Sequence, residues 1–258
     1  MMRSNDRRSQ SALLADMHYA VPLYKRAEAA RIIRVPASTL RDWAAPAPGT
    51  TAPIVAIEAT TPRDSALVAP IHHEGLITVA EPRTPRGATI PFVGLAEAYV
   101  LAAFRQAGVP MQRIRPALRR LEEEMGLVQA LASERLRTDG AEVLWDYSRE
   151  THDQATKDAV GDLVVVRNGQ LVFRPVVQDY LRRVTYGEGW ARVIDVGRGK
   201  VGVTVDPFIN GGQPTLARRG IAVTDILSRI RAGESSKDVA ADYGLRASEI
   251  TALLELAA

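Results

Sequence analysis

The segment from Tyr24 to Trp43, YKRAEAARIIRVPASTLRDW, predicts two short helices joined by a tight turn. In the first helix, residues 25–33, small and apolar residues recur every three positions, which places them on one face and lets a second helix approach closely. These inward residues are Ala27, Ala30 and Ile33. Pro36 ends the helix because it disfavours the helical conformation at Val35 and has no N–H to donate. The segment is therefore expected to fold as a helix-turn-helix.

The second helix, residues 37–43, is expected to bury Leu40 and Trp43 and to expose a polar face. That face carries Ser38, Thr39, Arg41 and Asp42. A short helix with hydroxyl and guanidinium groups suits the base edges in the major groove of DNA. An ordinary helical hairpin with a basic surface would give the same pattern, so the motif by itself leaves both interpretations open.

The charge of the chain is divided unevenly along its length. Residues 1–120 contain 16 Lys and Arg against 9 Asp and Glu, whereas residues 121–258 contain 17 against 21, in a chain of formal net charge +3. A basic first half favours a phosphate-bearing partner, because binding releases counterions from the phosphates. The acidic second half indicates a partner of opposite character, although solvated surface charge would give the same balance.

Two apolar runs, residues 75–79 and 88–90, predict a β-hairpin after the helix-turn-helix, with residues 81–87 at its tip. Such a hairpin would be a wing whose arginines reach the phosphate backbone. Together with cations on and beside the first helix, the expected phosphate contacts are Lys25, Arg26, Arg34, Arg83 and Arg86.

Glu28-Ala29-Ala30, Val35-Pro36 and the run from Ser38 to Trp43 together resemble the N-terminal winged helix-turn-helix of the MerR family. The sequence departs from that pattern at Arg34, which stands where the family usually has a glycine closing the first helix. The resemblance implies that the head of the chain binds a double-stranded DNA operator, with Ser38, Thr39 and Arg41 reading bases.

The likeness continues through two helices expected at residues 95–107 and 111–125, which in MerR regulators pack beneath the wing. A single helix-turn-helix covers only half of a near-palindromic operator, so a homodimer is expected. The second of these helices is the candidate dimer seam, although its apolar residues would serve equally well in a core. They are Ile114, Leu118 and Leu121.

Residues 140–205 are expected to be rich in β-structure. The candidate strands are residues 143–147, 163–166, 171–173, 190–196 and 201–205. Asn168-Gly169 predicts a hairpin because both residues tolerate positive φ, and Pro175 can open a helix running to Val184. An alternative function places a small organic effector in this region of a one-component MerR-like regulator. Its aromatic contacts would be Trp145, Tyr147, Tyr180 and Trp190, although such side chains are more often core residues.

The C-terminal residues predict three helices, 224–231, 236–243 and 247–256, with Ser235 capping the second. The whole chain is thus expected to be α+β, with an N-terminal winged helix-turn-helix, a middle β-rich segment and a C-terminal three-helix domain. The expected divisions are a disordered leader at 1–20, the winged helix-turn-helix with supporting helices at 21–130, the β-rich region at 140–205 and the three-helix domain at 206–258.

The segment from Gly211 to Leu254 is similar to a small family of unknown function, many of whose members accompany PIN-domain ribonuclease toxins as their antitoxins. The matching residues are Gly211-Gly212, Pro214, Ile221, Val223, Asp225-Ile226-Leu227, Gly233-Glu234-Ser235, Ala241-Asp242-Tyr243 and Leu245. The match departs at Arg218-Arg219-Gly220, where the family usually has Gly-Thr-Arg. Joined to a MerR-like head, this tail resembles the larger antitoxins of the VapB type.

That resemblance implies an antitoxin that represses its own operator and neutralises a PIN-domain ribonuclease. Arg218 and Arg219 are the candidate toxin contacts, although both would also fit a solvated loop. The surrounding surface is expected to be acidic and so to complement a basic RNA-binding face. Its acids are Glu234, Asp238, Asp242, Glu249 and Glu255.

The residue inventory argues against an enzyme. The chain has no cysteine, which excludes disulfides, thiolate metal sites and a cysteine nucleophile. Its four histidines lack metal-ligand spacing, and the adjacent His72 and His73 are expected in a loop. Glu122, Glu123 and Glu124 are expected to be a solvated helix end. We expect no catalytic residue, no metal, no cofactor, no membrane span and a cytoplasmic location.

Overall fold

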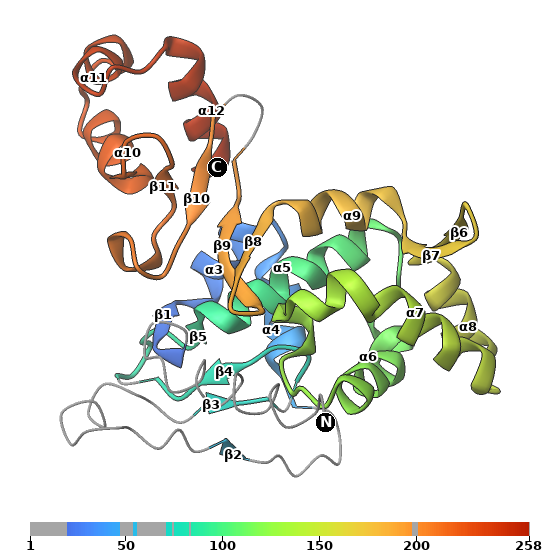
Figure 1. Cartoon of the computed structure of the whole chain (residues 1–258). Helices are drawn as coiled ribbons and strands as arrows, with labels where there is room; N and C mark the ends of the chain where they lie inside the picture. The colour runs from blue at the N-terminus through green and yellow to red at the C-terminus, as the bar shows by residue number, and fades with distance from the viewer. Residues whose placement is uncertain are drawn as a thin grey trace. The chain divides into compact units, whose positions relative to one another are not determined.

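The computed structural model describes residues 20–46, 54–55, 71–73, 75–82, 84–197 and 201–257. Helices and strands are mixed along these residues, which confirms the α+β class (Figure 1). The chain divides into two compact units, residues 1–191 and 192–258, and each is described by itself. Apart from Ala20, the expected leader lies outside the described residues. The domain boundaries expected from the sequence stay predictions.

The first unit begins with strand β1 (Pro22–Tyr24) and the two helices of the helix-turn-helix, α3 (Arg26–Ile33) and α4 (Ala37–Ala44). α3 ends at Arg34, which adopts a left-handed φ of 59°. Pro36 is the N-cap residue of α4, and no side chain caps that helix. Ala27 is exposed, so its predicted inward orientation is wrong. The buried residues of α3 are Ala29, Ala30, Ile32 and Ile33.

The two runs predicted to pair with each other as a wing hairpin belong to different sheets, so that predicted pairing is wrong; the segment from Val79 to Pro91 is still called the wing. Strands β2 (Ile54–Val55), β3 (Ile71–His72) and β4 (Val79–Ala80) form one antiparallel sheet, while β5 (Ile90–Pro91) pairs with β1. A backbone hydrogen bond of 2.8 Å from Ala80 N to Thr89 O joins β4 to the approach of β5. Thr89 N in turn donates to Tyr24 O at 3.0 Å, so the wing is hydrogen-bonded to β1, the strand that precedes the helix-turn-helix.

Helix α5 (Phe92–Gln106) is the central helix of the first unit, since every residue from Phe92 to Phe104 is buried (Figure 1). It packs against α3, the 3-10 helix η1 (Ala130–Ala132) and α9 (Pro175–Arg182). α6 (Met111–Met125) has the predicted bounds. Its apolar residues are core residues of the single chain, so the prediction that they form a dimer seam is wrong. They are Ile114, Leu118 and Leu121, with 0%, 3% and 0% of their surface exposed.

Helix α7 (Glu134–Glu150) occupies the residues expected to form a strand at 143–147, and that expectation is wrong. Ser133 begins the helix, because its hydroxyl accepts a hydrogen bond from Arg135 N at 3.2 Å. The buried positions follow helical spacing at Leu136, Gly140 and Leu144. α8 (Gln154–Gly161) then packs against α6 and α7.

The predicted hairpin is present as β6 (Val164–Arg167) and β7 (Gln170–Phe173). Its turn residues Asn168 and Gly169 have φ values of 52° and 77°, the left-handed conformation that such a two-residue turn requires. Pro175 opens α9 as expected, and β8 (Val184–Gly187) follows.

The second unit combines a small antiparallel sheet with three helices. Its strands lie in the order β12-β11-β10-β9, where β9 (Trp190–Asp195) begins in the first unit. The other strands are β10 (Val203–Val205), β11 (Thr215–Leu216) and β12 (Ile221–Ala222), with η2 (Asn210–Gly212) after β10. The helices are α10 (Val223–Arg231), α11 (Ser236–Asp242) and α12 (Ala247–Ala257), close to their predicted bounds. Among the described residues, no helix combines the length and apolar character that crossing a membrane requires.

Candidate nucleic-acid interface

The polar face of α4 is exposed to solvent because the opposite, apolar face of the helix is buried. Leu40 and Trp43 are 0% and 2% exposed, and they fix the helix against the rest of the helix-turn-helix. Ser38 and Arg41 are exposed on the opposite face, and Thr39 is half-buried. The Arg41 side chain is 66% exposed, and its Nε lies 4.0 Å from an Asp42 carboxylate oxygen that is itself exposed. Because exposed pairs of this kind are weak, the guanidinium can turn to another acceptor.

The predicted phosphate contacts lie around this helix-turn-helix and on the wing. Lys25 and Arg26 are exposed at the start of α3, and Arg34 is exposed at its end. Arg86 is exposed at the wing tip, with a left-handed φ of 69°. Arg83 lies outside the described residues.

Arg31 is an exposed cation that the sequence analysis missed. It lies one turn after Ala27 on the outer side of α3, three residues before Arg34. The three-residue spacing predicts Ala27 on the inner face, whereas residues 27, 31 and 34 form an exposed stripe on the outer side. The inner face of α3 includes Ala29 and Ile32 and does not include Ala27.

A buried cluster of ionisable side chains lies next to the start of β4. The His73 ring lies between two carboxylates, with its Nε2 2.8 Å from Glu122 Oε1 and its Nδ1 3.5 Å from Glu97 Oε1. Glu97, on α5, also accepts a hydrogen bond of 2.6 Å from Thr78 N, immediately before β4. His73 is thus more than the loop feature expected, and Glu122 is only 25% exposed at what was expected to be a solvated helix end.

The environment shifts the pKa of both partners. Burial raises the pKa of Glu97 from 4.5 to about 7, against the opposing effects of His73 and the Thr78 hydrogen bonds. Burial by itself lowers the pKa of His73, but the charges of Glu97 and Glu122 and the hydrogen bond to Glu122 outweigh it and leave that pKa raised. Within the described part of the chain, no group of His, Asp or Glu has the arrangement of a metal site.

In the second unit, the two candidate toxin contacts join the turn between β11 and β12 to the α11–α12 region. Arg218 Nη2 lies 3.0 Å from the carboxylate of Glu249, and the Arg218 side chain is 52% exposed. Glu249 is buried and also accepts a hydrogen bond of 2.8 Å from Arg246 N, the largest cause of its lowered pKa. Arg219 Nη2 donates to the Gly244 carbonyl at 3.2 Å.

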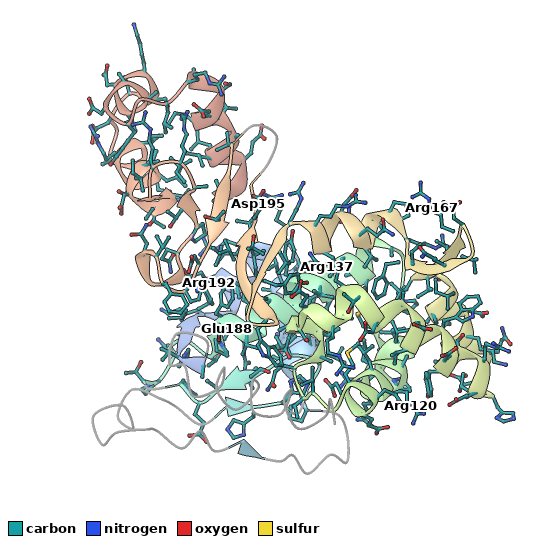
Figure 2. All side chains as sticks on the ribbon, in the orientation of Figure 1. Arg120, Arg137, Arg167, Glu188, Arg192 and Asp195 are labelled. Carbon is teal, nitrogen blue, oxygen red and sulfur yellow. The ribbon has the colours of Figure 1, made fainter. Side chains whose placement is uncertain are left out.

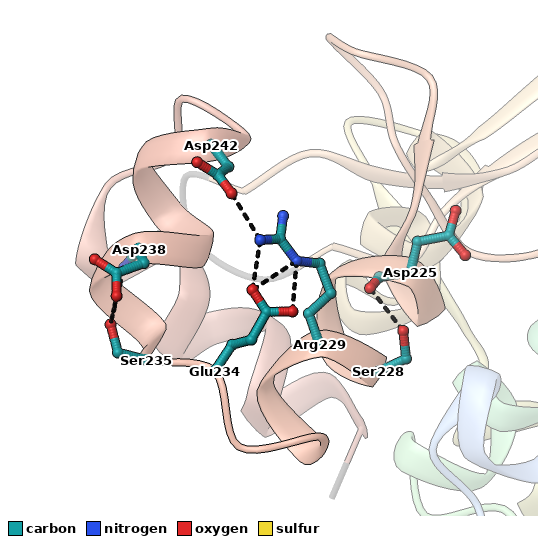
Figure 3. A network of polar contacts seen from close by, with 7 residues as sticks. All are labelled: Asp225, Ser228, Arg229, Glu234, Ser235, Asp238 and Asp242. Carbon is teal, nitrogen blue, oxygen red and sulfur yellow. Dashed lines mark hydrogen bonds and ion pairs between the residues drawn. The ribbon is translucent and has the colours of Figure 1, made fainter.

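Arg229 neutralises two of the acids expected to form an acidic surface (Figure 3). Its Nε donates to Glu234 at 2.9 Å, its Nη2 donates to Asp242 at 2.6 Å, and its guanidinium lies 5.4 Å from the centre of the Tyr243 ring. Ser235 caps α11 through the N–H of Asp238 at 3.1 Å, as predicted. Because Glu249 is buried as well, the acidic surface is smaller than the sequence suggests.

Two of the four aromatic residues considered for an effector, Tyr180 and Trp190, have packing roles. Tyr180 lies with its ring centre 4.9 Å from that of Tyr99 and donates from its hydroxyl to Gln106 at 2.7 Å. Trp190 is 4% exposed. Trp145 and Tyr147 lie half-buried on α7.

Comparisons with known proteins match both ends of the chain. Residues 22–118 match a family described as "Putative DNA-binding HTH domain", and residues 203–257 match a family described as "Protein of unknown function (DUF433)". A Mycobacterium tuberculosis protein described as "Putative antitoxin VapB45" is 38% identical over 93% of this chain and 95% of its own length. The crystal structure of Rv2018 from the same organism, also 38% identical, matches with a TM-score of 0.74 over 92% of this chain and 98% of that one.

Proposed function

Because the chain belongs to the family of the mycobacterial protein described as "Putative antitoxin VapB45", we propose that it is the antitoxin of a type II toxin–antitoxin system. It binds its operator DNA and represses its own expression, and it neutralises a PIN-domain ribonuclease toxin by a non-enzymatic mechanism in the cytoplasm. The observation that carries the DNA-binding half is the helix-turn-helix itself, in which a buried Leu40 and Trp43 present an exposed Arg41.

On DNA, α4 enters the major groove and α3 crosses the phosphate backbone. Arg41 reads base edges together with the hydroxyl groups of Ser38 and Thr39, since a guanidinium pairs in a bidentate manner with guanine. The surrounding cations contact phosphates and position the helix. They are Lys25, Arg26, Arg34, Arg83 and Arg86.

The toxin-facing half uses Arg218 and Arg219. A PIN nuclease holds its metal with carboxylates, and a guanidinium pairs with carboxylates through two parallel hydrogen bonds. Glu249 has a second partner in Arg246, so Arg218 can exchange to a toxin carboxylate while Glu249 stays hydrogen-bonded. Phe208 and Ile209 in the same unit are 40% and 44% exposed, which supports contact with another protein surface.

The protein acts on DNA as a homodimer, because two copies match the two halves of a near-palindromic operator. The seam cannot be formed by Ile114, Leu118 and Leu121, which are buried within one chain. Sedimentation of the protein at micromolar concentration tests this part of the proposal. A monomer that still binds its operator tightly would contradict it.

Substitution Arg41→Ala tests the DNA-binding half. It should weaken binding to the operator by about 1–3 kcal/mol and leave binding to random DNA nearly unchanged, because only base contacts distinguish the two. Arg167→Ala is the control, since Arg167 is also an exposed arginine and lies on the β6–β7 hairpin of the same unit (Figure 2). Equal weakening on both DNA sequences would show that Arg41 contacts phosphate and does not read bases.

A further inference from the structure

A cavity of about 670 Å³ opens in the first unit among α7, α9 and the β6–β7 hairpin. The apolar part of its lining, here called the floor, is formed by side chains that are buried or half-buried. These are Ala141, Leu171, Val172, Phe173 and Leu181. The volume falls within the range of pockets that hold small organic molecules. None of the residues proposed above to contact DNA or toxin lines it.

The polar and charged lining residues are here called the rim, and two of them are arginines, one from α7 and one from α9. Arg137 on α7 lies with its guanidinium 5.1 Å from the centre of the Tyr186 ring and 2.5 Å from Glu134 (Figure 2). Arg182 on α9 lies 2.8 Å from Asp179. Both acids lie three residues away on the same helix and are partly exposed. Such pairs contribute little, so either guanidinium can turn to an acceptor in the cavity at small cost.

The remaining polar lining is mostly neutral. Thr138, Gln170 and Gln178 supply a hydroxyl and two amides, and Glu142 is the one acid among the lining residues. The acids that pair with the two arginines, Glu134 and Asp179, do not line the cavity, so a ligand carboxylate there competes with them for the two guanidinium groups. The apolar floor favours a ligand with a hydrocarbon body.

We propose that this cavity binds a small organic monocarboxylic acid. Its hydrocarbon part lies on the floor at Leu171 and Phe173, and its carboxylate lies between Arg137 and Arg182, where bidentate pairing is available. The site is independent of the proposed antitoxin function, because it uses neither the helix-turn-helix nor the second unit.

Calorimetric titration of the full chain with benzoate, phenylacetate and octanoate tests the proposal. At least one of them should bind with a dissociation constant of about 1 mM or tighter, and the matching neutral amide should bind at least tenfold more weakly. Arg137→Gln combined with Arg182→Gln should reduce carboxylate binding at least tenfold. Gln178→Glu, which adds a negative charge at the rim, should reduce it as well. Arg167→Gln is the matched control and should bind as the wild type does.

Four outcomes would overturn the proposal. Absence of binding by all three carboxylates would exclude the site. Equal binding of acid and amide would leave an apolar hollow without charge recognition. Equal binding of inorganic phosphate would show a general anion site, and equal loss in Arg167→Gln would place binding elsewhere. Because Arg137 and Arg182 are exposed, melting temperatures of the variants should match the wild type, which separates lost binding from misfolding.

Discussion

Replacing Glu97 by Gln should remove most of the pH dependence of the first unit's stability between pH 5 and 8. Glu97 lies on the buried central helix α5 and contacts both His73 and the backbone of Thr78. Gln has nearly the same shape, and its carbonyl oxygen can still accept the Thr78 hydrogen bond. The substitution therefore removes an ionisation and leaves the packing of α5 in place.

The sign and size of this pH dependence follow from the pKa of Glu97. Because burial raises it from 4.5 to about 7, the folded protein keeps a proton that the unfolded chain has released. The stabilisation of the folded state by this bound proton is fully present below pH 4.5 and is lost as the pH rises through about 7. The difference corresponds to roughly 3 kcal/mol of unfolding free energy. The raised pKa of His73 acts in the same direction, since its contribution is also lost as the pH rises.

Urea unfolding followed by tryptophan fluorescence measures this effect. All three tryptophans lie within residues 1–191, so the signal reports the first unit. The stability of Glu97→Gln relative to the wild type should increase from pH 5 to pH 8 by up to about 3 kcal/mol. The stability of Glu123→Gln, at an exposed glutamate of α6, should have the same pH dependence as that of the wild type. Parallel curves for Glu97→Gln would refute the reasoning.

Substitutions at three further positions test local features. Arg34→Gly should be about 1 kcal/mol more stable to unfolding than Arg34→Ala, because only glycine relieves the left-handed φ, while both should lose the same phosphate contact and salt dependence in DNA titrations. Leu40→Ala should destabilise the first unit by about 2–5 kcal/mol in urea unfolding, since Leu40 is fully buried; a loss below 0.5 kcal/mol would contradict the packing described. Ser235→Ala should cost about 1 kcal/mol through loss of the α11 cap, with faster amide hydrogen exchange in α11 and unchanged exchange in α4.

The helix-turn-helix and the three C-terminal helices could be predicted because their signals are local. Pro36 interrupts one helix and begins the next, and Ser235 caps α11 through its own neighbour Asp238. The helix α7 could not be predicted, because Gly140 stands in the middle of its buried stripe and shows no apolar side chain. A Cβ atom at that position would lie 2.9 Å from Leu136 and 3.3 Å from Phe173, so the missing side chain is what allows β7 to pack there.

Only part of the candidate site could likewise be predicted from the sequence. Arg41 was placed correctly on the exposed face of α4 because Leu40 and Trp43 fix the register. The partners of His73 are 24 and 49 residues away in sequence, at Glu97 and Glu122, and only the tertiary fold brings them together. The pairing of acids with Arg229 likewise depends on the loop between α10 and α11 and on the end of α11, so a count of charges overstated the acidic surface.

The two ends of the chain are proposed to have separate tasks, and both tasks can be measured on the same full-length variants. Operator binding is measured in vitro, and neutralisation is measured as growth rescue against a co-expressed PIN-domain toxin. Arg41→Ala should lose operator binding and keep rescue, whereas Arg218→Gln with Arg219→Gln should keep operator binding and lose rescue. Arg246→Gln, which removes the other arginine of Glu249, is the matched control and should keep both. Loss of both activities in either test variant, the reverse pattern, or equal loss of rescue in Arg246→Gln would contradict the account.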